Sequence, residues 1–213
     1  MKTNEVDIDM RHTMYPSFGK FSTALRVEPF STVYGYVYGD NNVILPGGQK
    51  ATSGQYFCYP CFDSSEDQWI AGNSSFVTFT RLGYLGQFVI GGPVENSGRL
   101  CYIDGCSDSL LIYPPRLGDP SLNALFFPKG IEQSFHIHPS IRLGFIAKGS
   151  GFCDLKDKRI PLTAGNMFCI EEREYHRFVT EDTEMVVMAY HPDGDWGPTD
   201  ENHTMLNRTY LTK

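Results

Sequence analysis

Three histidines, His136, His138 and His176, are the side chains in this sequence best suited to chemistry. His136 and His138 lie two positions apart, so on a β-strand both imidazoles point to one face of a sheet. A cation above that face can accept a nitrogen lone pair from each ring. His176 follows an apolar run that predicts a neighbouring strand, from which it can supply a third nitrogen. The sequence therefore predicts one divalent metal ion bound by His136, His138 and His176.

The residues around the first two histidines form a longer pattern. Gly130 precedes His136 with five residues between them, and Gly149 closes the segment after His138. In this frame the sequence resembles the first motif of the cupin superfamily, which reads G, five residues, H-x-H, a short spacer, E, six residues, G. Five constraints within twenty residues make this part of the resemblance fairly specific.

A second, looser match follows about a dozen residues later. Pro161, Gly165 and His176 resemble the second cupin motif, with one extra residue between the proline and the glycine. The resemblance covers about residues 120–192. It implies an all-β cupin jelly-roll barrel whose metal ion is held by the three histidines. The half that precedes the barrel is either a degenerate second cupin, which would make the chain a bicupin, or a source of extra strands.

Arg142 stands where the cupin motif usually has a glutamate ligand. A cation cannot ligate a metal, so the site becomes a three-histidine site unless another group supplies a fourth ligand. Some cupin dioxygenases bind iron through three histidines alone. One of three nearby carboxylates, Glu171, Glu172 or Glu174, could supply a further metal ligand. The simpler interpretation is that these residues form a solvated loop.

The same Arg142 changes the charge of the cavity. Three neutral imidazoles leave the metal with its full charge, and on a regular strand Arg142 shares the parity of His138. We therefore expect a small anionic ligand, a carboxylate or enolate, that chelates the metal while Arg142 grips it through paired hydrogen bonds. The alternative is an ordinary salt bridge from Arg142 to Glu132 or Glu171.

The resemblance leaves the reaction open, because one fold supports many functions. We lean towards an enzyme, a cupin-type oxidoreductase. Three histidines leave up to three coordination positions, enough for a bidentate substrate and dioxygen, which favours an Fe2+ dioxygenase. Zn2+, Ni2+ and Mn2+ are alternative metals. Two other functions remain: a metal-assisted isomerase or lyase, and a non-enzymatic cupin that binds or senses a small ligand.

The six cysteines offer a weaker alternative site. Cys58 and Cys61 have the spacing of a zinc or redox pair, and Cys101 and Cys106 could complete a zinc site only with poor spacing. Packed, unpaired thiols are the better interpretation. No export signal is visible in the sequence, so we expect reduced cysteines and a cytoplasmic location.

Short β-prone runs separated by turn residues cover most of the chain and predict an all-β sandwich or barrel. A change in composition near Pro114 suggests a boundary there. We expect an N-terminal arm (1–20), a β-rich N-terminal half (21–113), the metal-binding barrel (114–192) and a C-terminal tail (193–213). The strands are expected at 31–38, 55–59, 75–80, 87–90, 100–103, 110–113, 124–127, 134–138, 141–147, 151–155, 167–170, 176–180 and 184–191.

Composition narrows the range of partners. The formal net charge is −7 and no basic run occurs, which argues against nucleic acid or an anionic membrane as a partner. No apolar run is long enough to cross a bilayer. Exposed edge strands and a polar arm favour a homodimer. The expected partner is thus a small anionic molecule.

Overall fold

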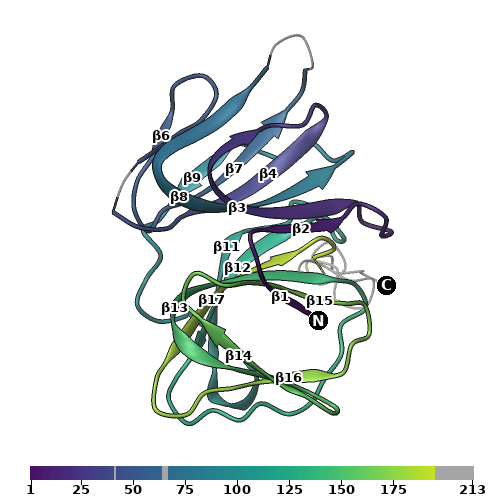
Figure 1. Cartoon of the computed structure of the whole chain (residues 1–213). Helices are drawn as coiled ribbons and strands as arrows, with labels where there is room; N and C mark the ends of the chain where they lie inside the picture. The colour runs from purple at the N-terminus through teal and green to yellow at the C-terminus, as the bar shows by residue number, and fades with distance from the viewer. Residues whose placement is uncertain (41, 64–66, 195–213) are drawn as a thin grey trace, which may run out of the picture.

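The computed structural model describes residues 1–40, 42–63 and 67–194, and the chain folds as two antiparallel β-sheets stacked on one another (Figure 1). One short 3-10 helix, Ile103–Gly105, is the only helix among these residues. None of the described residues forms a helix that could span a membrane. The prediction of an all-β protein is confirmed. The C-terminal tail expected at 193–213 lies outside the described residues from 195 onward.

The N-terminal sheet has eight strands in the order β2-β3-β8-β4-β7-β9, with β5 paired to β8 and β6 paired to β5. Of its two longest strands, β3 was not predicted and β8 was predicted only at 75–80, because polar residues interrupt their apolar alternation. The strands are β2 (Asp7–Met10), β3 (Ser17–Arg26), β4 (Ser31–Val37), β5 (Val43–Ile44), β6 (Lys50–Ala51), β7 (Tyr56–Cys61), β8 (Trp69–Leu82) and β9 (Val89–Gly91).

The C-terminal sheet has nine strands in the order β1-β15-β13-β17-β12-β11-β10, and β14 and β16 both pair with β13. These pairings bend the sheet into a barrel, seen end-on in the lower half of Figure 1. The strands are β1 (Lys2–Glu5), β10 (Leu100–Cys101), β11 (Ser107–Ile112), β12 (Ser121–Phe127), β13 (Arg142–Leu155), β14 (Arg159–Thr163), β15 (Met167–Ile170), β16 (His176–Val179) and β17 (Met185–His191).

Strand β13 makes this curvature possible. Two separate strands were expected here, since Gly149 predicts a turn. Instead one strand of 14 residues continues through a register shift between Ile146 and Lys148 and a left-handed Gly149 with φ of 72°. An irregularity of this kind bends a strand without ending it. The first part of β13 therefore pairs with β15 and β17, and the last part with β14 and β16.

Three hydrophobic cores stabilise the two layers. One fills the far side of the N-terminal sheet, one lies inside the barrel, and one lies between the two sheets. In the last core, Tyr190 of the barrel stacks on Phe79 and packs against Tyr34 of the N-terminal sheet. Alternate residues of β17 thus serve different cores, with Met188 and Tyr190 facing the other sheet and Val187 and Ala189 facing the barrel interior.

The chain changes sheet between β9 and β10, upstream of the boundary expected near Pro114. Strands β11 and β12, on either side of that proline, are neighbours in the same sheet. Within the expected N-terminal arm, β1 pairs with β15 of the barrel, and β2 pairs with β3 of the N-terminal sheet. Residues 7–91 therefore form a sheet of their own, whereas β10 and β11, from the end of the expected N-terminal half, add strands to the sheet of the barrel.

Candidate metal centre

His136 and His138 lie on an extended segment between β12 and β13. The strand expected at 134–138 is wrong: the segment has only isolated bridges, Glu132 to Val179 and His136 to His176. Pro139 has no backbone N–H to donate and interrupts regular pairing. The bridge between His136 and His176 nevertheless holds these two residues in place. His136 N donates to His176 O at 2.9 Å and His176 N donates to His136 O at 3.1 Å, so the two histidines are directly opposite one another.

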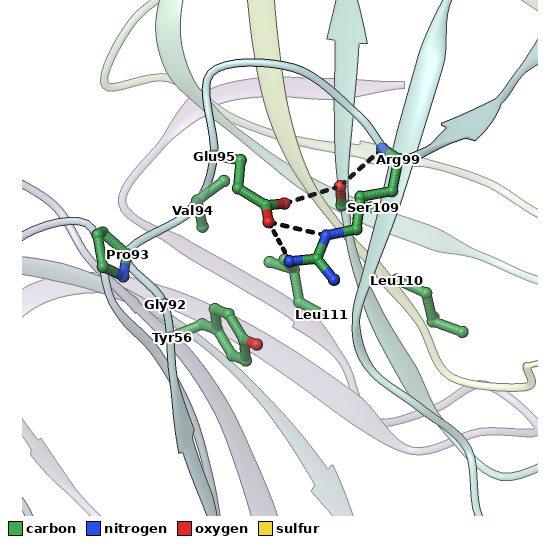
Figure 2. Close-up of a pocket in the computed structure, with 9 residues that line it drawn as sticks. All are labelled: Tyr56, Gly92, Pro93, Val94, Glu95, Arg99, Ser109, Leu110 and Leu111. Atoms are coloured by element: carbon green, nitrogen blue, oxygen red, sulfur yellow. Dashed lines mark hydrogen bonds and ion pairs between the residues drawn. The ribbon is translucent and has the colours of Figure 1, made fainter.

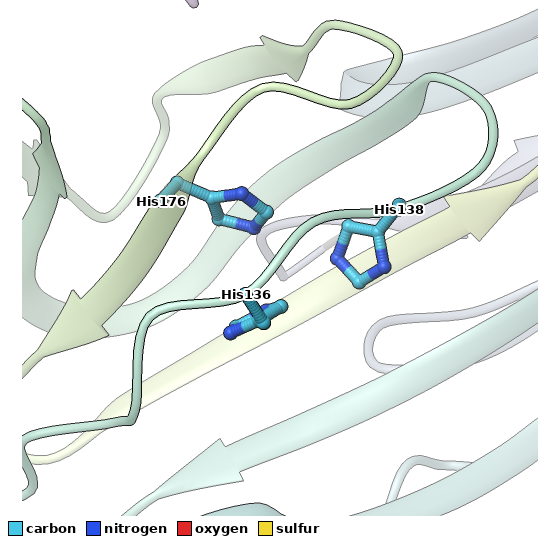
Figure 3. A group of neighbouring side chains, drawn as sticks. All are labelled: His136, His138 and His176. Carbon is cyan, nitrogen blue, oxygen red and sulfur yellow. The ribbon is translucent and has the colours of Figure 1, made fainter.

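The three imidazoles converge on one point (Figure 3). Ring centroids are 4.5 Å apart for His136 and His176, 5.0 Å for His138 and His176, and 5.1 Å for His136 and His138. One nitrogen from each ring lies within 4.8 Å of the others. The structure thus brings together all three of the histidines that the sequence singled out.

Backbone carbonyls fix the orientation of two of these rings. Nδ1 of His136 lies 2.9 Å from Ser134 O, and Nδ1 of His176 lies 2.7 Å from Glu174 O. A carbonyl can only accept, so Nδ1 carries the proton and Nε2 keeps its lone pair, the arrangement usual for metal-ligating histidine. His176 Nε2 is buried and has no hydrogen-bond partner among the described residues. An orphaned acceptor aimed at two other imidazoles fits a divalent metal ion.

The electrostatics of the site keep these rings neutral. Burial, reinforced by Arg142 and the other two histidines, lowers the pKa of His138 to about 3. Burial also lowers the pKa of His176 to about 4, although its hydrogen bond to the Glu174 carbonyl opposes the shift. Because a metal binds the unprotonated imidazole, both rings are ready to ligate at neutral pH.

Arg142, at the start of β13, is buried and lines the same cavity as the histidines. Its Nη1 donates to Asp193 Oδ1 at 3.0 Å and to Ile141 O at 3.0 Å, and it also bonds Ser140. The salt-bridge partner is therefore Asp193 rather than Glu132 or Glu171, and Glu132 pairs with Arg177 instead.

The cavity inside the barrel is small, about 30 Å³. His191, which the sequence motifs did not identify, lines this cavity together with Arg142 and the three histidines. Burial, followed by the nearby Arg142 and His138, lowers the pKa of His191 well below its usual range. The alternation of Val187, Ala189 and His191 along β17 was the available signal, because it places all three on one face.

The other expected contributors lie elsewhere. Within the described part of the chain, no carboxylate joins the three-histidine cluster, and Glu171 and Glu172 are exposed. Cys58 and Cys61 lie on β7, in the other sheet. All six cysteines are free, and all but Cys101 are buried.

Comparison with known proteins agrees with this geometry. The family described as "Cupin domain" matches residues 125–191, which run from the last part of β12 to the end of β17. A search of curated proteins found no significant match. Many solved structures resemble the fold.

Three of these structures illustrate how far the likeness extends. The cupin 2 conserved barrel domain protein from Leptotrichia buccalis is 13% identical over 89% of this chain and 90% of its own, with a TM-score of 0.60. The putative glyoxylate induced protein from Pseudomonas aeruginosa is 12% identical over 91% of this chain and 81% of its own, with a TM-score of 0.63. Salicylate 1,2-dioxygenase from Pseudaminobacter salicylatoxidans is 8% identical over 82% of this chain and 70% of its own, with a TM-score of 0.58. The likeness confirms the jelly-roll fold and extends over most of the chain.

Proposed function

We propose that this chain, whose residues 125–191 match the cupin domain family, is a metal-dependent oxidoreductase that acts on a small anionic substrate. The observation that carries the proposal is the convergence of three imidazoles, two of them half-buried and the third, His176, buried with an orphaned Nε2. His136, His138 and His176 would hold one divalent ion through their Nε2 atoms. We propose Fe2+ as the native metal, because a three-nitrogen set with open positions suits non-haem iron oxygenases.

The protein would prepare this site rather than perform the redox chemistry itself. When bound, the metal supplies Lewis acidity and, as iron(II), the capacity to react with dioxygen. The carbonyls of Ser134 and Glu174 orient the rings of His136 and His176 before the ion arrives. The apolar barrel wall, including Phe168 and Phe178, limits the access of water. Three neutral ligands leave the ion with its full charge, which favours an anionic substrate.

We propose that Arg142 recognises the anionic group of this substrate. Its guanidinium faces the histidine cavity and already pairs with one carboxylate, that of Asp193. An incoming carboxylate that pairs through Nη1 would compete with Asp193 for this donor, since bidentate pairing uses two parallel N–H groups of one guanidinium edge. The fold-level neighbour salicylate 1,2-dioxygenase, whose structure is also known with gentisate, is consistent with such a substrate class.

One observation favours a second function, that of a cupin which binds a metal and a very small ligand without turnover. The cavity of about 30 Å³ holds little more than a few water molecules. Arg142 is also charge-neutralised by Asp193 in this structure. An organic substrate would need the cavity to widen, whereas a small ligand would not.

Metal reconstitution under anaerobic conditions separates the two functions. The purified protein would be loaded with Fe2+, Zn2+, Mn2+ or Ni2+, and dioxygen uptake followed across small hydroxy- and keto-acids. The oxygenase proposal predicts uptake with Fe2+ only, in proportion to substrate, and a large rise in KM for Arg142→Ala. A protein that retains one metal ion but consumes no dioxygen with any acid would favour the binding function.

A further inference from the structure

A second cavity, of about 310 Å³, lies at the junction of the two sheets. Tyr56 on β7 contributes one wall, and Ser109, Leu110 and Leu111 on β11 contribute the opposite wall (Figure 2). The segment 92–99, which connects the sheets, closes a third side. We call this cavity the junction pocket. It is about ten times larger than the histidine cavity, shares no lining residue with it, and falls within the size range of small-molecule sites.

The connecting segment is fixed closely against β11. Gly98 N donates to Ser107 Oγ at 3.1 Å, and Arg99 N donates to Ser109 Oγ at 3.2 Å. A Cβ added at Gly98 would lie 2.3 Å from Asp108 N, so only glycine permits this approach. A Cβ added at Gly91 would likewise lie 2.4 Å from the Tyr56 ring. These two glycines hold the walls of the pocket in place, so the pocket exists before a ligand binds.

Two side chains of opposite charge, Arg99 and Glu95, lie side by side in the pocket. Each has one polar atom that can still bind a ligand. Arg99 donates through Nε, at 2.7 Å, and through Nη2 to the same oxygen, Oε1 of Glu95. Arg99 Nη1 donates to no residue that the structure describes. Glu95 Oε2 has only a long contact, 3.5 Å, with Ser109 Oγ. The pair therefore offers an incoming molecule a cationic donor and an anionic acceptor next to each other.

The remaining lining is apolar or aromatic. Val94 and Leu111 present aliphatic side chains, and Tyr56 presents a ring with a polar tip. A single-charge ligand would be attracted by one member of the Glu95–Arg99 pair and repelled by the other. A molecule that carries both charges avoids this conflict, since it can oppose each member with its complement.

We propose that the junction pocket binds a small zwitterion, an α-amino acid with an apolar side chain. Its carboxylate would accept from Arg99 Nη1, its ammonium would donate to Glu95 Oε2, and its side chain would pack on Val94 and Leu111. The pocket joins residues of both sheets, so the ligand would bridge them. This site does not depend on the metal or on the function proposed for the histidines.

Four probes with a matched six-carbon chain test the proposal: L-norleucine, hexanoate, hexylamine and hexan-1-ol. Calorimetric titration of the full chain should show norleucine binding roughly tenfold or more tighter than either single-charge probe, because each lost charge-assisted hydrogen bond weakens binding by about that factor. Norleucine should also shift the NMR signals of Val94 and Leu111. Hexylamine or hexanoate binding as tightly as norleucine, or no norleucine binding at all, would overturn the proposal.

Paired variants assign the two charges. Glu95→Gln should abolish the preference for norleucine over hexanoate, and Arg99→Gln should abolish its preference over hexylamine. The matched control is Asp67→Asn, because Arg26 also donates through Nε and Nη2 to one oxygen of Asp67, on the exposed surface of the N-terminal sheet. The control and His176→Ala should bind norleucine as the wild type does. Unchanged norleucine binding in both pocket variants, or NMR shifts that map away from the pocket, would refute the assignment.

Discussion

The two sheets of this protein are built in the same way but enclose different interiors. Each is antiparallel, and each pairs a glycine with a phenylalanine directly across two strands: Gly35 with Phe57, and Gly144 with Phe168. A Cβ at either glycine would lie about 2 Å from the opposite ring, at 2.0 Å from Phe57 and 2.1 Å from Phe168. In both sheets the ring covers the backbone that the glycine leaves bare.

The interiors differ in their polar residues. The core of the N-terminal sheet contains residues such as Phe18, Val33 and Ile70, and no histidine occurs between residues 20 and 110. The barrel interior holds histidines and Arg142 around a cavity. The comparison teaches that the shared architecture supplies stability, whereas the chemistry depends on a few polar substitutions on inward-facing positions.

The largest expected effect is on metal affinity, which should depend on a histidine of the barrel but not on one near the N-terminal sheet. His176→Ala removes one of the three proposed Nε2 ligands, so metal affinity should fall at least about 100-fold, the upper range reached by loss of outer-shell partners alone. His12→Ala, an exposed histidine of the N-terminal sheet region, is the matched control and should leave affinity unchanged. Equilibrium dialysis with elemental analysis measures both. Equal affinities in the two variants would remove the histidine site from the account.

A second effect concerns pH and the metal-free protein. The pKa of His138 is about 3 and that of His176 about 4, whereas imidazole in an unfolded chain titrates near 6.5. Between about pH 6.5 and pH 4 the unfolded chain therefore binds protons that the folded chain does not. The free energy of unfolding should decrease as pH falls through this window and stay level above it. Urea denaturation at several pH values measures the slope.

The matched control for that slope is His138→Gln, which removes one of the three depressed titrations, those of His138, His176 and His191. Its stability should depend less on pH than that of the wild type, while His12→Ala should parallel the wild type. A wild-type stability that does not change between pH 7 and pH 4 would contradict the buried, neutral state of these rings.

Substitution of Gly35 and of Gly144 tests the comparison of the two sheets. Gly35→Ala and Gly144→Ala both force a methyl group into a packed ring, and each should lower the free energy of unfolding by about 1–3 kcal/mol. Only Gly144→Ala should also weaken metal binding, since Phe168 lines the histidine cavity. Chemical denaturation and metal titration of the pair test this. Weaker metal binding in Gly35→Ala as well would mean that the sheets are coupled more tightly than proposed.

The sequence predicted the grouping of the three histidines better than the strands around them. His136 and His138 could be identified because the spacing of Gly130, the two histidines and Gly149 is local. The pair Arg142–Asp193 spans 51 residues, and no local pattern specifies such a contact. The continuity of β13 was also beyond prediction, because Gly149 predicts a turn and only the strands paired before and after it show that β13 continues.

The smallest expected effect concerns Asp193. Asp193→Asn removes the carboxylate that neutralises Arg142, so small anions such as acetate should bind the metal-loaded protein more tightly, by up to roughly tenfold. Isothermal titration with acetate measures the change, and Asp67→Asn, which releases an arginine on the exposed surface, is the control. Weaker acetate binding in Asp193→Asn would show that Asp193 positions Arg142 rather than competing with the ligand.

Anomalous diffraction from metal-loaded crystals tests the central claim most directly. We predict one strong peak per chain, about 2.0–2.2 Å from the Nε2 atoms of His136, His138 and His176, as expected for first-row metals bound by imidazole. A chain with no peak there, or with its metal at the Cys58–Cys61 pair instead, would contradict the account.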